Sequence, residues 1–196
     1  MLDLLNLVIG PATGAVIAAV LAWLIGNRVA ARWSLWQKRR EAALVAVAEH
    51  ARLYGEFFSI WKLWNYSLHD DLSAPANTQW ALLERAASAE ASVESLLVRL
   101  ACESRLQSRE IEIAGKFRQA YQQLREVIRD GTKLDWPRHN HPEYVAFKRL
   151  AAELALLVSA IDRRGQSLAS EASAAILEIT SNKWEACWTE PVGSPE

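Results

Sequence analysis

The densest group of side chains that could carry out chemistry lies in Asp135-Trp136-Pro137-Arg138-His139-Asn140-His141-Pro142-Glu143. Its two histidines and two carboxylates are of the residue types that bind zinc. However, His139 and His141 lie close together in an expected loop, and nothing in the sequence singles out a third and a fourth ligand. His141-Pro142-Glu143 is also an ordinary helix start, because proline suits the first helical turn. We therefore interpret the segment as a helix cap and a solvated loop, and we predict no metal ion and no cofactor.

Contact with a partner protein is the other interpretation of this segment. Trp136, Arg138 and His139 are the side chains that would make the contact, because Trp and Arg anchor many protein interfaces. Two further tryptophans, Trp64 and Trp188, lie near the ends of expected elements and are candidates for the same role. A protein partner is therefore one of our predictions.

No other motif indicates catalysis. The chain has no phosphate-binding glycine loop, no His-Glu-x-x-His and no Cys-x-x-Cys. The pair Glu49 and His50 has the character of an ordinary helix surface. A helical protein of this size invites comparison with the HEPN ribonucleases, which carry an Arg followed shortly by a His on one helix, and no such pair occurs here. We therefore expect a non-enzymatic protein, with a helical-bundle nuclease or a metal-dependent enzyme as the less favoured alternative.

The first element of the chain is an uncharged apolar run. No charged residue occurs between Asp3 and Arg28, and the run from Leu4 to Asn27 consists mostly of Leu, Ile, Val, Ala and Gly. About 20 apolar helical residues cross a bilayer core. A group of cations follows at once, comprising Arg28, Arg32, Lys38, Arg39 and Arg40. The sequence predicts a transmembrane helix over residues 1–27 and a basic juxtamembrane segment over residues 28–40.

The flanks of this run predict how it would sit in a membrane. Trp23, Trp33 and Trp36 bracket the cations, as aromatic residues do at membrane interfaces. A cleaved signal peptide would carry its positive charge before the apolar run instead. Because cationic flanks stay on the cytoplasmic side, we expect a single-pass protein of the plasma (inner) membrane with its N-terminus outside and its C-terminal domain in the cytoplasm. Membrane lipid is thus an expected partner.

Small residues recur at every fourth position of the predicted span. They are Gly10, Gly14, Ala18, Ala22 and Gly26. This spacing lets two helix backbones approach closely in a membrane, so we expect a homo-oligomer formed through this face. Asn6 and Thr13 lie beside the ridge and would line a narrow pore if several copies formed a ring, whereas Leu5, Ile9, Val16 and Trp23 lie on the opposite, lipid-facing side.

The rest of the chain favours an all-α fold, an antiparallel bundle of about five helices over residues 41–188. The apolar spacing of three and four residues predicts helices over 34–68, 77–104, 108–130, 142–165 and 167–188. The polar tail 189–196 is expected to be disordered. Each helix has a predicted inward face. For 34–68 it is Leu44, Val47, Ala51, Tyr54, Phe58, Trp61 and Leu68, widened by Phe57, Ile60 and Trp64, and for 77–104 it is Leu82, Ala86, Ala89, Val93, Leu96, Leu97 and Leu100. For 108–130 it is Ile111, Phe117, Tyr121, Leu124 and Ile128; for 142–165 it is Tyr144, Phe147, Leu150, Leu154, Leu157, Val158 and Ile161; and for 167–188 it is Leu168, Ala172, Ile176, Ile179 and Trp184.

Charge and cysteine content exclude other classes. From Glu41 onward the chain has 17 basic and 22 acidic residues. An acidic domain does not suit nucleic acid, which needs a basic surface to displace counterions, so we predict no nucleic-acid partner. The two cysteines, Cys102 and Cys187, lie in apolar helical surroundings and are interpreted as reduced core thiols.

These predictions combine into one functional hypothesis. A membrane-anchored bundle that self-associates would act as a non-enzymatic effector, perturbing the membrane or forming a pore. The overall plan resembles that of small membrane effectors of bacterial defence and stress systems. That resemblance implies a soluble domain that receives a signal and a span that responds. The alternative is a membrane-tethered adaptor or scaffold that binds a partner protein through its cytosolic bundle.

Overall fold

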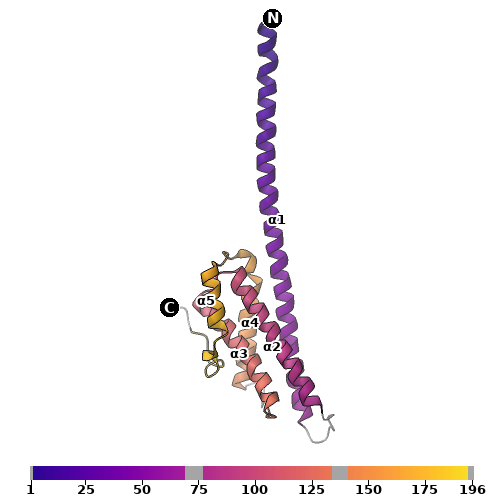
Figure 1. The fold of residues 1–196 in the computed structure, drawn as a ribbon, viewed down its shortest axis with the longest axis vertical. Coiled ribbons are helices and arrows are strands. Elements are labelled where there is room, and N and C mark those ends of the chain that lie inside the picture. Colours follow the sequence, from indigo (N-terminus) through magenta and orange to yellow (C-terminus); the bar gives the residue numbers. More distant parts are fainter. Residues whose placement is uncertain (1, 69–76, 134–140, 194–196) are drawn as a thin grey trace. The chain divides into compact units, whose positions relative to one another are not determined.

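A computed structural model describes the backbone of residues 2–68, 77–133 and 141–193, with side chains described at 22–23 and from Gly26 onward within these ranges. The described residues form an all-α protein (Figure 1). Its elements are α1 (Leu2–Ser67), α2 (Thr78–Glu103), α3 (Ser108–Arg129), α4 (Pro142–Ser159), the short 3-10 helix η1 (Ile161–Arg163), α5 (Ala169–Ile179) and the short 3-10 helix η2 (Asn182–Trp184).

The chain divides into two compact units, residues 1–41 and residues 42–196, and α1 continues through the division. We call them the N-terminal segment and the bundle. Within the described residues, no helix combines the length and the apolar character needed to cross a membrane. Most side chains of the predicted span, Leu4 to Asn27, lie outside the described set.

The part of α1 in the bundle buries a stripe with alternating spacings of three and four residues. The stripe consists of Ala43, Ala46, His50, Leu53, Phe57, Ile60 and Trp64. The predicted face is confirmed at Phe57, Ile60 and Trp64, which are buried. Its other positions lie about one residue away from the buried stripe: Leu44 is 62% exposed, and Val47 is only partly buried. Apolar residues flank the stripe on one side, so periodicity defines the inward half of the helix but not its centre.

An aromatic cluster fills the middle of the bundle. Phe57 of α1 and Phe147 of α4 are fully buried and stack with ring centroids 3.8 Å apart. The ring of Phe117 from α3 is also stacked with that of Phe147, with the two centroids 5.6 Å apart. The hydroxyl of buried Tyr121 donates to the Leu53 carbonyl oxygen at 2.7 Å, and burial raises the pKa of this phenol. Three helices thus meet at one packed centre.

The faces predicted for α2, α3 and α4 are largely confirmed. All seven positions predicted for α2 are buried, from Leu82 to Leu100. Ile111 of α3 and Tyr144 of α4 are only partly buried. Gly131 follows α3 with a φ of +70°, the left-handed conformation that glycine adopts without strain. The break between α2 and α3 is real: Gln107 and Glu110 bond each other's backbone N–H groups in a reciprocal cap.

The last two predicted helices are shorter than expected. The helix predicted over 167–188 ends at Ile179, where the hydroxyls of Thr180 and Ser181 donate to the carbonyl oxygens of Ile176 and Glu178. Such local bonds compete with helix continuation. Leu168 was expected to be buried but is 65% exposed, because it precedes the first turn of α5. α4 ends at Ser159 and tightens into η1.

The segment after α5 folds back on the bundle. Trp184 and Trp188 are both buried, and the Trp184 indole N–H donates to the Glu178 carbonyl oxygen at 3.0 Å. Val192 packs against the core, so contacts continue into the stretch for which disorder was predicted. The cysteines are free, but Cys102 is exposed and Cys187 half-buried. Their interpretation as core thiols was therefore wrong for Cys102, which lies on the outward side of α2.

Candidate functional site

The basic segment that follows the predicted span forms an exposed collar, which we define as residues 23–40. The Trp23, Trp33 and Trp36 side chains are 65%, 64% and 42% exposed. The five cations are exposed as well, namely Arg28, Arg32, Lys38, Arg39 and Arg40. The rings of Trp33 and Trp36 lie 5.3 Å apart, and the Arg40 guanidinium lies 5.3 Å from the Trp36 ring centroid. Indoles and cations thus share one short stretch of helix.

Helical geometry distributes the collar around its axis. At about 100° per residue, Trp33 lies about 80° and Trp36 about 140° from Trp23 around the helix axis, both in the same direction of rotation. Arg28, Arg32 and Arg39 fall within about 40° of one another on the side away from Trp23. A helix that packs on one protein partner presents a single apolar stripe. A ring of indoles and cations is instead typical of residues at a membrane surface, where every side of the helix meets the interface.

Two members of the small-residue ridge lie among the described side chains. Ala22 and Gly26 are exposed, and a Cβ built on Gly26 would meet no atom within 4 Å. The side chains at Gly10, Gly14 and Ala18 lie outside the described residues, as do the pore-facing candidates Asn6 and Thr13. At Gly26 the chain therefore leaves open space in which a second helix backbone could pack.

The candidate partner-binding residues Trp136, Arg138 and His139 also lie outside the described residues. His141 is the residue before α4, and its Nδ1 lies 3.9 Å from a Glu143 carboxylate oxygen. Across the described ranges, no three His, Cys, Asp or Glu side chains are grouped as metal ligands would be.

The other two tryptophans proposed for partner contact are buried. Trp64 is 3% exposed and donates to the Thr132 carbonyl oxygen at 2.8 Å, and Trp188 is 4% exposed. Their proposed role was therefore wrong, because their rings are needed in the core. Among the described tryptophans of the bundle, Trp80, at the start of α2, is exposed, at 70%. Trp80 falls outside the buried stripe of α2, and no motif in the sequence marked it as a residue that would contact a partner.

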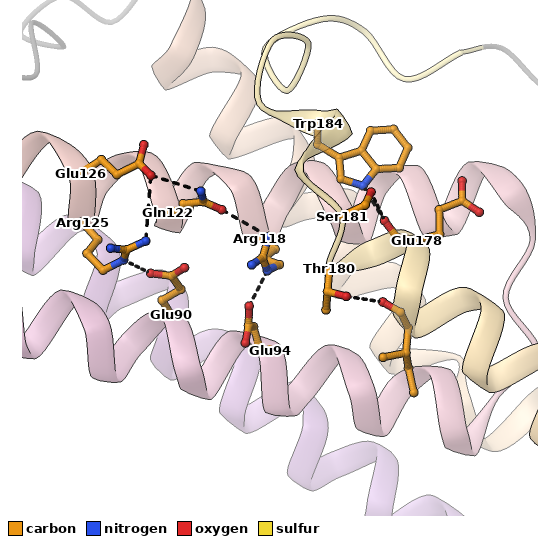
Figure 2. Close-up of polar contacts among 11 residues, drawn as sticks. Glu90, Glu94, Arg118, Gln122, Arg125, Glu126, Glu178, Thr180, Ser181 and Trp184 are labelled. Atoms are coloured by element: carbon orange, nitrogen blue, oxygen red, sulfur yellow. Dashed lines mark hydrogen bonds and ion pairs between the residues drawn. The ribbon is translucent and has the colours of Figure 1, made fainter.

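Polar side chains form a lattice between α2 and α3 (Figure 2). Arg118 donates to Glu94 at 2.5 Å, and Arg125 pairs with Glu90. Gln122 connects the two pairs along α3, since it accepts from Arg118 at 3.3 Å and donates to Glu126 at 3.2 Å. Charged pairs at two levels fix how the antiparallel helices align, and every group has a partner, so the lattice has the character of a structural feature.

A second polar group lies where α3 and α4 meet the C-terminal segment. Lys116 is 2% exposed, and its ammonium group lies 2.7 Å from a Glu112 carboxylate oxygen and 3.3 Å from the Glu190 carbonyl oxygen. Arg149 donates to the same carbonyl oxygen at 3.1 Å. Pairing satisfies the charge of Lys116, as a buried ammonium requires.

His50 is a buried polar residue that the sequence did not reveal. It is 5% exposed, although it was interpreted as part of a helix surface. Its Nε2 lies 2.9 Å from the Ala151 carbonyl oxygen, and burial lowers the pKa of its imidazole. Because a carbonyl oxygen only accepts, Nε2 carries the proton. The signal that was missed is its position in the stripe of Leu53 and Phe57.

The chain matches no protein-family model, no curated protein and no solved structure. Its function must therefore be argued from its own residues. Among the described residues, the collar is the surface whose composition points most directly to a binding partner. Indoles and cations are the side chains that are enriched where a helix meets the interface of a lipid bilayer.

Proposed function

We propose that this chain is a membrane-anchored, self-associating helical protein that acts as a non-enzymatic effector at the bilayer. The observation that carries the proposal is an uncharged run of 24 residues, Leu4 to Asn27, whose last residues lead into the exposed collar. A bilayer would take up the apolar run, the headgroups would bind the cations, and the indoles would lie at the boundary. The acidic bundle, residues 42–196, would remain in the cytoplasm as the part that receives a signal.

The anchor predicts how the full-length chain partitions. After alkaline lysis without detergent, the wild-type protein should remain in the membrane pellet. Replacing Ile17 and Leu21 with arginine should move it towards the supernatant, because each central arginine costs about 2.5–3.5 kcal/mol of insertion free energy. Ile17→Leu with Leu21→Ile keeps the apolar character and serves as the control. A wild-type chain recovered wholly in the soluble fraction would contradict the anchor.

If the chain self-associates through the small-residue ridge, larger side chains on the ridge should weaken the oligomer. Ala22→Leu with Gly26→Leu should shift crosslinked species in lipid towards the monomer, because the larger side chains keep helix backbones apart. Apart from its own helix backbone and its two chain neighbours, no described atom lies within 4 Å of the Cβ position of Gly26, so a loss of oligomer would report on a neighbouring copy. Val16→Leu, on the predicted lipid-facing side, should leave the oligomer intact. If all three samples give the same distribution of species, this face is not the interface.

A membrane-tethered adaptor is the second candidate function. It is favoured by large apolar side chains on the outside of the bundle, including Trp80, Leu156 and Leu177, which are each at least 70% exposed. Of these three, Trp80 is of a residue type that commonly anchors protein interfaces. Planar-bilayer recordings separate the two functions. A steady current from the purified chain supports the effector, and an electrically silent bilayer supports the adaptor.

A further inference from the structure

A groove runs between α1 and α4 within the bundle. It has a volume of about 400 Å³ and is lined by His50, Tyr54, Lys148 and four alanines. Ala51 and Ala152 are two of these alanines, and both are exposed. Because small residues stand on both helices at the same level, the helices leave uncovered space there. The volume falls within the range of small-molecule sites, about 300–1,000 Å³.

The groove has an apolar body and one charged end. Lys148 is the single lysine or arginine among the lining residues, and none of them is acidic. Its ammonium group lies 5.3 Å from the centroid of the Tyr144 ring, and no carboxylate in the described part of the chain forms an ion pair with it. An exposed cation beside apolar walls is complementary to a molecule that carries one negative charge on an apolar chain.

His50 forms part of the floor of this groove, and packing alone does not explain a histidine there. The residue is 5% exposed, its Nε2 donates to the Ala151 carbonyl oxygen, and its Nδ1 has no hydrogen-bond partner among the described residues. Burial lowers the imidazole pKa and favours the neutral form. The floor of the groove is therefore polar but uncharged. Among the lining residues, a ligand would meet the positive charge of Lys148 alone.

We propose that this groove binds a small monoanionic amphiphile, with its apolar chain on the alanines and its anionic group paired with Lys148. A free fatty acid of medium length is the simplest molecule with this chemistry. The site lies wholly within the bundle, so it does not depend on the anchor or on self-association. Binding there would give the bundle a way to sense a lipid-derived signal.

The test measures binding of octanoate to the full-length chain in lipid nanodiscs by titration calorimetry, with empty nanodiscs subtracted. Octanoate should bind saturably, and octylamine, which carries the opposite charge, should not. Ala152→Phe would fill the groove and should weaken octanoate binding by about tenfold or more. Lys148→Glu should weaken it by up to about fivefold, the range of an exposed ion pair.

Matched variants distinguish the groove from general surface binding. Ala87→Phe adds the same ring to an exposed alanine of α2, and Lys62→Glu reverses an exposed lysine of α1 outside the groove. Both should bind octanoate as the wild type does. Near-UV circular dichroism checks that each variant is folded, and Lys148→Glu keeps the test valid if Ala152→Phe does not fold. The proposal is overturned if octanoate does not saturate, if octylamine binds equally well, or if the groove variants match their controls.

Discussion

Replacing Phe147 with alanine is expected to lower the free energy of unfolding by about 3–5 kcal/mol, the largest effect of any single core substitution considered. Phe147 is fully buried on α4, stacks on Phe57 at 3.8 Å and on Phe117 at 5.6 Å, and lies 6.1 Å from the Tyr121 ring. Alanine would remove a ring that three helices share, and the rigid neighbours could not collapse into the space. Typical domains are stable by about 5–15 kcal/mol, so the loss would be a large part of the stability of a domain at the lower end of that range.

Thermal unfolding of the full-length chain, followed by near-UV circular dichroism, measures this loss. Leu156→Ala provides the control on the same helix, because Leu156 is 70% exposed. It should change stability by less than about 0.5 kcal/mol. Phe147→Leu should lie between the two and keeps the comparison possible if the alanine variant is unfolded at the outset. Equal stability of Phe147→Ala and Leu156→Ala would contradict the position of the aromatic cluster.

Gly115→Ala should destabilise the bundle although alanine is the better helix former. A Cβ on Gly115 would overlap Nε1 of Trp184 and lie 2.5 Å from its Cδ1. The indole cannot move away freely, because it is buried and its N–H donates to the Glu178 carbonyl oxygen at 3.0 Å. Overpacking costs about 1–3 kcal/mol, which outweighs the gain of about 1 kcal/mol expected from helix propensity.

Gly55→Ala is the matched control for this substitution. Gly55 also lies within a helix, but a Cβ there would meet nothing within 4 Å. That variant should gain up to about 1 kcal/mol from helix propensity alone. In a Trp184→Ala background the penalty of Gly115→Ala should disappear, so a double-mutant cycle in urea unfolding isolates the contact. If Gly115→Ala and Gly55→Ala shift stability alike, Trp184 does not cover Gly115.

The sequence predicted the bundle best where one helix face is apolar and the other polar. The face of α2 from Leu82 to Leu100 is of this kind, and all its predicted positions are buried. α1 was misjudged by about one residue, because Leu44 and Val45 are apolar but exposed, while the smaller Ala43 and Ala46 are buried. Where two helices cross, the size of the side chains that fit depends on the partner helix. The apolar pattern of one helix alone does not show this.

The candidate sites show the same division. The collar could be recognised from the sequence because tryptophan, arginine and lysine are residue types that are typical of an interface. All of the named tryptophans and cations are exposed in the structure. The groove was not recognisable, because it depends on alanines from α1 and α4 that are far apart in the chain and unremarkable alone. His50 was missed for a related reason: a lone histidine beside Glu49 suggests a surface unless the stripe through Leu53 is traced back to it.

The shared carbonyl oxygen of Glu190 has a consequence for how the bundle opens. Lys116 of α3 and Arg149 of α4 both donate to it, at 3.3 Å and 3.1 Å. If the final described stretch peeled away, both cations would lose this acceptor at once, although Lys116 would keep its ion pair with Glu112. The described stretch up to Glu190 is therefore held against fraying. This stretch belongs to the same cooperative folding unit as α3 and α4, the two helices that contact it.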